Sequence, residues 1–164
     1  MSLVRSTGEK IYTNYAKMFT YGNIKFSTES TKVENWLDNS DMNISQGKFV
    51  CEPNLSRIKI PASSASLVEV GGLICGYGNF MAVIDIIDSD NNSLTAGMHQ
   101  AFGVLSQSGG NKYAKVALPA MSLKIPDKSK DYYITLKLNG YNEDFDMNSG
   151  FGTFATYIYV KQID

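Results

Sequence analysis

The dominant pattern along the chain is an alternation of apolar and polar residues with a period of two. It is clearest in "YYITLKLNG" (132–140), where the even-numbered residues up to 138 are apolar and residues 135, 137 and 139 are polar. This alternation predicts a β-strand with one buried face and one wet face. The same period, or a run of β-branched and aromatic residues, predicts further strands at 80–88, 112–118 and 121–125.

Clusters of turn-forming residues separate these strands at short intervals: "DSDNNS" (88–93), "SQSGGN" (106–111), "PDKSKD" (126–131) and "NGYNED" (139–144). One weak helical pattern, at 31–38, is too short to contribute a stable helix. Many short strands without helices between them predict an all-β fold, a two-sheet antiparallel sandwich of the jelly-roll kind.

The last segment, "NSGFGTFATYIYVKQID" (148–164), is apolar on both alternate faces of the predicted strand. One row comprises Phe151, Ala155, Tyr157 and Tyr159, and the other comprises Phe154, Ile158 and Val160. Each large aromatic side chain carries about 150–250 Å² of surface. An exposed row would therefore approach the apolar patch of roughly 300–600 Å² that is the largest on a typical monomer. We expect both faces of this strand to be covered.

Composition narrows the class of protein. A chain of 164 residues fits one domain, and we expect residues 1–14 to form a flexible lead-in or the end of a stalk before a domain at 15–164. The net charge of −1, without a basic block, disfavours nucleic-acid binding. No apolar run reaches the ~20 residues that would span a membrane, so we expect no membrane insertion. The start of the chain lacks the apolar core of a signal peptide.

The sequence offers no convincing catalytic or cofactor site. His99 is the single histidine, and it shows no zinc-ligand spacing with Cys51 or Cys75, which we expect to be buried thiols, although a single bridge between them stays open. No G-x-S-x-G elbow is present, and "GYGNFM" (76–81) lacks the third glycine of a dinucleotide fingerprint. We predict that the protein is not an enzyme and has no cofactor.

Two acidic segments have the Asp-x-Asp-x-Asn spacing that opens a calcium loop: Asp88, Asp90 and Asn92, and Asp144, Asp146 and Asn148. Both lack the glycine that should follow and the glutamate at the twelfth position. We interpret them as solvated turns that could face a ligand. Glu143 lies beside Asp144, and paired acids of this kind leave a glycoside hydrolase as the most distant alternative.

Four segments resemble the jelly-roll head domain of the tumour necrosis factor and complement globular-head family. They are "QGKFVCE" (46–52), "ALPAMSLKIPDKSKDYYITLKL" (117–138), "SGFGTFATYIYV" (149–160) and, similar to bacterial and phage versions, "RIKIPASSASLVEVGGLICG" (57–76). The resemblance implies that Gly47 makes a turn and that Phe49 and Cys51 point inward. It also implies a sandwich of about ten strands that assembles as a homotrimer, with the first, third and last strands near the threefold axis.

With this resemblance, a trimer interface is the expected cover for the second face of the last strand, because a heterologous contact that closes into a ring leaves no exposed end. We assign Phe151, Tyr157 and Tyr159 to that interface and Phe154, Ile158 and Val160 to the core. Alternation does not fix which face is inside. Cover by loops or by the N-terminal segment of the same chain is the alternative.

The expected function is a non-enzymatic trimeric binding or structural head, from a phage tail-fibre or baseplate protein that recognises a bacterial surface saccharide or protein. Such a protein would belong to a virion assembled in the reducing host cytoplasm, which suits unpaired thiols. One alternative is a monomeric carbohydrate-binding module that displays Trp36, Tyr77 and Tyr141. Another is a structural protein of a bacterial surface or spore coat.

Overall fold

The computed structural model describes all of the chain except residues 1–2, 5–9, 12, 39–40, 96–100, 104–112 and 153–154. The described residues form β-strands and one short 3-10 helix, η1. Their bounds are β1 (Leu3–Val4), β2 (Lys10–Ile11), β3 (Tyr15–Phe19), β4 (Ile24–Phe26), β5 (Thr31–Lys32), β6 (Ile44–Gln46), β7 (Val50–Glu52), η1 (Pro53–Leu55), β8 (Arg57–Ile60), β9 (Leu67–Tyr77), β10 (Phe80–Asp88), β11 (Ala101–Gly103), β12 (Tyr113–Lys124), β13 (Tyr132–Gly140), β14 (Phe145–Met147) and β15 (Tyr157–Gln162).

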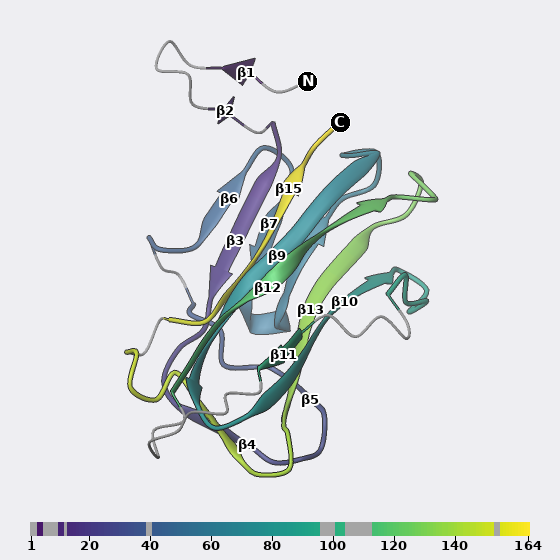
Figure 1. Ribbon diagram of the computed structural model, residues 1–164. Coiled ribbons are helices and arrows are strands. Elements are labelled where there is room, and N and C mark those ends of the chain that lie inside the picture. The colour runs from purple at the N-terminus through teal and green to yellow at the C-terminus, as the bar shows by residue number, and fades with distance from the viewer. Residues whose placement is uncertain are drawn as a thin grey trace.

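Two antiparallel sheets pack face to face, which confirms the predicted sandwich (Figure 1). The six-stranded sheet has the order β11-β10-β13-β8-β7, with β5 also paired to β13. The seven-stranded sheet has the order β4-β14-β9-β15-β3-β6, with β12 also paired to β9. The two sheets hold more strands than the ten or so that were predicted, because strands of two or three residues leave no readable alternation in the sequence.

The long strands follow the predicted pattern most closely. β10 and β13 have the predicted bounds, whereas 112–118 and 121–125 are one strand, β12, with a register shift between Leu118 and Met121. Pro119 lies at that shift, where a residue without an N–H group is tolerated in a ladder. The weak helical pattern at 31–38 does not form a helix; it contains β5 and an isolated bridge between Thr20 and Trp36.

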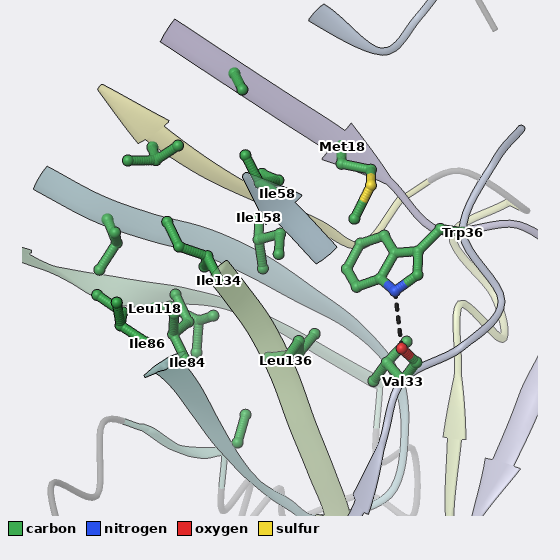
Figure 2. Close-up of a cluster of buried hydrophobic side chains, with 14 of the residues drawn as sticks. Met18, Val33, Trp36, Ile58, Ile84, Ile86, Leu118, Ile134, Leu136 and Ile158 are labelled. Atoms are coloured by element: carbon green, nitrogen blue, oxygen red, sulfur yellow. Dashed lines mark hydrogen bonds between the residues drawn. The ribbon is translucent and has the colours of Figure 1, made fainter. Parts of the chain in front are cut away.

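The core lies between the sheets and is made of aliphatic and aromatic side chains from both (Figure 2). The apolar row of β13 faces it, and its four side chains are at most 1% exposed: Tyr132, Ile134, Leu136 and Leu138. Trp36 is also buried there, and its Nε1 donates to the Val33 carbonyl at 2.8 Å (Figure 2). Thr135, predicted on the wet face, is 4% exposed instead. Asp85 is its cross-strand neighbour, and residues 93–95 fold back over this pair. The hydroxyl groups of Ser93 and Thr95 donate hydrogen bonds to Asp85 Oδ1.

The last strand is shorter than predicted and begins at Tyr157. Ile158 and Val160 are fully buried, which confirms their assignment to the core, while Phe154 lies outside the described residues. Residues 148–151 form a turn, with positive φ at Asn148 and Gly150. Phe151 therefore lies in a turn and not in the strand that contains Tyr157 and Tyr159.

Three expectations from the resemblance concern the segment before β7. Gly47 has φ +67°, and a Cβ there would lie 2.2 Å from the Thr13 carbonyl oxygen, so the predicted glycine turn is confirmed. Phe49 is fully buried. Cys51 is half-buried, and its single S–H is shared between the carbonyl oxygens of Lys17 and Ile44, which lie 3.3 and 3.2 Å from Sγ.

The two ends of the sandwich differ. At one end β3 begins and β15 finishes, and at the other β4 and β5 lie beneath the two sheets (Figure 1). In the segment predicted as a lead-in, β1 pairs with β2. Asn14 belongs to the sandwich, because it is 5% exposed and its amide donates to Ser64 O and Gln162 Oε1. No helix among the described residues is long and apolar enough to cross a membrane.

Candidate functional site

The outward side of the seven-stranded sheet carries two groups of aromatic side chains. The register places Phe19 of β3 beside Tyr157 of β15, and Tyr157 beside Leu73 of β9. One step along, Lys17 lies beside Tyr159, and Tyr159 beside Gly71. We call this surface the aromatic face; it comprises Tyr15, Lys17, Phe19, Leu73, Tyr77, Tyr113, Phe151, Tyr157 and Tyr159. The sequence predicted that Tyr157 and Tyr159, at the centre of this face, lie on the same side of the last strand.

Tyr159 is fixed at the centre of this face by a glycine and a carboxylate. A Cβ on Gly71 would lie 2.6 Å from Tyr159 Oη and 2.8 Å from its ring, so the ring occupies the space that a side chain at 71 would need. The hydroxyl donates to Glu69 Oε1 at 3.0 Å, and Lys161 Nζ lies 2.8 Å from the same oxygen. Burial and then the Glu69 carboxylate raise the pKa of Tyr159 to about 12. The phenol is thus neutral and held in one orientation.

Lys17 makes the second fixed contact on the aromatic face. Its Nζ lies 3.9 Å from the ring centroid of Tyr157 and 4.7 Å from that of Phe19, and the two rings are 5.4 Å apart. The cation therefore lies against two aromatic rings, a contact that strengthens as water is removed. Burial lowers the pKa of Lys17. Sequence reasoning missed this strand, although "YAKMF" (15–19) has the period of two that could have identified it.

The more exposed part of the face is an aromatic cluster at the far end of β9 and β12. Tyr113 makes edge-on contacts with Tyr77, at a centroid separation of 5.3 Å, and with Phe151, at 6.1 Å. These three side chains are 36–44% exposed. At 150–250 Å² for each full side chain, they alone present roughly 200–300 Å² of aromatic surface to solvent. Phe151 thus joins the face from a turn and not from the strand in which it was predicted.

The outward side of the six-stranded sheet is different in kind. Three ion pairs within the protomer lie on it: Glu52 with Arg57, Lys59 with Asp131, and Lys137 with Asp85. Arg57 also lies 3.8 Å above the ring of Tyr133. A surface of paired charges is stable in water by itself, whereas an aromatic surface gains free energy when it is covered.

The first Asp-rich segment is a self-contained turn. Asp88 Oδ1 accepts the N–H groups of Asp90 and Asn92, each at 2.9 Å, which caps the turn and holds the pKa of Asp88 well below its usual range. Lys130 Nζ lies 3.1 Å from Asp88 and 2.6 Å from Asp90. A lysine thus occupies the position between the carboxylates where a cation would have to bind. Asp88 is 6% exposed, so Asp90 and Asn92 are the members that reach solvent.

The three residues of the second Asp-rich segment lie in different surroundings: Asp144 on the surface, Asp146 on a strand and Asn148 in the interior. Asn148, predicted to face a ligand, is 1% exposed. Its amide donates to Thr20 Oγ1 and Gly22 O and accepts from the Thr156 N–H, so it cross-links three segments of the fold. Asp146 lies on β14, and Asp144 pairs with Lys25 at 3.7 Å on the surface. The three oxygens do not converge on one point, because one is committed to the core.

The remaining candidate residues are the histidine, the two cysteines and the three aromatic residues proposed for display. His99 lies outside the described residues, and Cys51 and Cys75 are both free thiols. Within the described part of the chain, no group of three or more histidine, cysteine or acidic residues could hold a metal ion. Of the aromatics proposed for display, Tyr77 and Tyr141 are exposed, but Trp36 is 6% exposed in the core, because its indole fills the space beside Met18 (Figure 2).

Comparison with known proteins was informative at the level of structure alone. No family model and no curated protein matches the sequence. Among solved structures, the chain is similar to the Eiger TNF of S. frugiperda, with a TM-score of 0.60 over 92% of each chain and 8% sequence identity. At that identity the likeness concerns the fold. The chain is a tumour necrosis factor-like jelly-roll sandwich.

Proposed function

We propose that the protein is a non-enzymatic binding head that assembles as a homotrimer through the aromatic face. The observation that carries this proposal is the contrast between the two outward sheet surfaces. Three ion pairs lie on the first, whereas the second is mainly aromatic and has one ion pair, between Glu69 and Lys161. In a homotrimer, one kind of contact is repeated three times around a closed ring, and it covers the aromatic face of every protomer. Tyr159 and Lys17 support it, because both side chains are already held in place before assembly.

The biological setting that we propose is a phage tail fibre or baseplate, where the head recognises a saccharide or protein of the bacterial surface. The resemblance of residues 57–76 to bacterial and phage versions of the fold supports this setting. So do the two free thiols, which suit a virion protein assembled in the reducing cytoplasm of the host.

Light scattering coupled to size exclusion, at micromolar concentration, tests the assembly. We expect a mass three times the 18.1 kDa of the chain. A stable mass of one chain would refute the trimer. It would instead favour a monomeric carbohydrate-binding module, a second candidate that the exposed cluster of Tyr77, Tyr113 and Phe151 supports.

A truncation distinguishes assembly from cover by the chain's own N-terminal segment. Deleting residues 1–12 leaves Asn14 and its hydrogen bonds intact. We expect the truncated chain to remain trimeric with an unchanged melting temperature. Loss of the trimer together with a lower melting temperature would show that residues 1–12 cover or build the interface.

A further inference from the structure

One carboxylate lies on the strands that carry most of the aromatic face. β6, β3, β15, β9 and β12 lie side by side in the seven-stranded sheet, and Glu69 is the single acidic residue within their bounds. The same strands contain four lysines: Lys17, Lys115, Lys124 and Lys161. The cross-strand register places all five side chains on the outward side of the sheet. Four lysines against one glutamate make this surface cationic.

Glu69 is held between two groups that interact with its negative charge. Its Oε1 accepts a hydrogen bond from Tyr159 Oη at 3.0 Å and lies 2.8 Å from Lys161 Nζ. The side chains of Lys161 and Glu69 are 20% and 21% exposed, so the ion pair already lies mostly out of water within one protomer. Gly71 leaves the room that the ring of Tyr159 needs to reach the carboxylate. Glu69 thus orients the central phenol and compensates the charge of one lysine.

The groups around Glu69 differ in how they respond to acid. They are Tyr159 and Lys161 on β15, Tyr15 and Lys17 on β3, Ser122 and Lys124 on β12, and Asp164 after β15. Lysine and tyrosine keep their protons throughout the acid range, and burial together with Glu69 raises the pKa of Tyr159 to about 12. Asp164 lies at the end of the sheet, where its Oδ2 accepts the Ser66 N–H at 2.9 Å. Within the five strands, therefore, Glu69 is the group whose charge changes when the solution is acidified.

Covering the aromatic face changes what this ion pair contributes. An interface there removes the remaining water from Lys161 and Glu69, and a lysine that loses its water without a counter-charge is strongly destabilising. While Glu69 is ionised, the covered pair has no net charge. When Glu69 is protonated, Lys161 is left uncompensated in each of the three copies, and the excess of positive charge on every face grows by one. Desolvation and repulsion then both oppose assembly.

From this geometry we infer that Glu69 makes assembly through the aromatic face dependent on pH: the trimer forms while Glu69 is ionised and dissociates when Glu69 takes up a proton. The inference rests on the proposed trimer and names its regulation. Glutamate carboxylates ordinarily take up protons near pH 4, so dissociation is expected as pH falls through about 4. The protomer stays folded through this step, because Val68 and Val70, on either side of Glu69 in β9, remain in the core.

The test measures the trimer dissociation constant by sedimentation equilibrium between about pH 7 and about pH 3.5, with circular dichroism at each pH to verify the fold. Glu69→Gln removes the charge and keeps an acceptor for Tyr159. Glu52→Gln is the matched control, because Glu52 pairs with Arg57 on the other sheet at a similar exposure of 25%. We expect the wild-type constant to rise at least tenfold in acid without loss of fold. Glu69→Gln should be at least tenfold weaker at about pH 7 and unchanged by acid, and Glu52→Gln should behave as wild type.

Three results would overturn the inference: a folded wild-type trimer that is equally stable or more stable in acid, a Glu69→Gln trimer as stable as wild type at about pH 7, or an equal loss of stability in Glu52→Gln. If acid unfolded the wild-type chain, the two variants at about pH 7 would decide. A trimer that is indifferent to Glu69 refutes the pH dependence and keeps the proposed assembly. A mass of one chain at about pH 7 refutes the trimer and this inference together.

Discussion

Replacing Tyr157 by Asp should dissociate the trimer while leaving the protomer folded. Within the protomer the change removes a ring contact with Phe19, at 5.4 Å, and a cation contact with Lys17, at 3.9 Å. The first contributes about 0.5–1.5 kcal/mol and the second about 0.5–2 kcal/mol. The new carboxylate can pair with Lys17, which returns part of this loss. We therefore expect the protomer to lose only about 1–2 kcal/mol of folding free energy.

The cost to assembly is larger. An interface that buries Tyr157 would lose the apolar area of its ring and would have to desolvate a carboxylate and a lysine together. Truncating a buried aromatic anchor typically costs 2 kcal/mol or more, which is about a 30-fold increase in a dissociation constant. Three symmetric copies carry the substitution. At micromolar concentration we expect the mass of one chain with a cooperative melt.

Tyr133→Asp is the matched control. Tyr133 has a cation, Arg57, 3.8 Å above its ring and is likewise half-buried, but it lies on the outward side of the six-stranded sheet. The control should lose similar folding stability and stay trimeric. If Tyr157→Asp remained trimeric with wild-type melting, or if Tyr133→Asp alone dissociated the trimer, the aromatic face would not be the interface.

Three further predictions concern stability. Asp85 and Asp88 have folded-state pKa values below their usual range because of hydrogen bonds from neighbouring hydroxyl, N–H and ammonium groups. Their stabilisation is present above about pH 4, near the unfolded pKa, and is lost as pH falls further, so thermal melts should drop in that window and drop less in Asp85→Asn. Tyr159 has its pKa raised to about 12, so its contribution is present below about pH 10, the unfolded pKa, and is lost as pH rises toward 12. Absorbance titration should show a late-ionising component that is lost in Tyr159→Phe. Ile158→Ala, at a fully buried position, should cost about 2–5 kcal/mol by urea unfolding, and a cost below 1 kcal/mol would contradict its place in the core.

The sequence predicted the long strands, in which apolar and polar residues alternate. It did not predict the short segments whose conformation depends on contacts with other parts of the chain. β10 and β13 could be read directly, since the apolar row of each faces the core, although Thr135 on the other row of β13 is also buried. The turn at 148–151 could not be read, because its aromatic and glycine residues continue the apolar pattern of the strand that follows. The helical pattern of 31–38 was equally misleading, because Trp36 is held by Val33 and Thr20 and not by a helix.

For the candidate sites too, features local to one strand could be predicted, whereas contacts between segments could not. Tyr157 and Tyr159 were predicted to share an outward row because alternation along one strand is local information. Lys17, Phe19 and Gly71 come from other strands, and their contacts depend on register, which sequence alone does not specify. Asn148 failed as a ligand-facing residue for a related reason. A polar residue in an acidic segment looks solvated until the segments that it joins, at Thr20, Gly22 and Thr156, are brought together.

The distribution of charge between the two sheets links the fold to the proposed assembly. Both sheets carry cations above aromatic rings, but Arg57 over Tyr133 also pairs with Glu52, whereas Lys17 over Tyr157 has no carboxylate partner among the described side chains. On the first surface the arrangement is complete within one protomer. On the second, a cation and its rings stay partly hydrated, and their attraction grows when a neighbouring surface excludes that water. The same residue pattern thus stabilises a protomer on one side and favours association on the other, and the difference lies in whether a carboxylate pairs with the cation above the ring, as Glu52 pairs with Arg57.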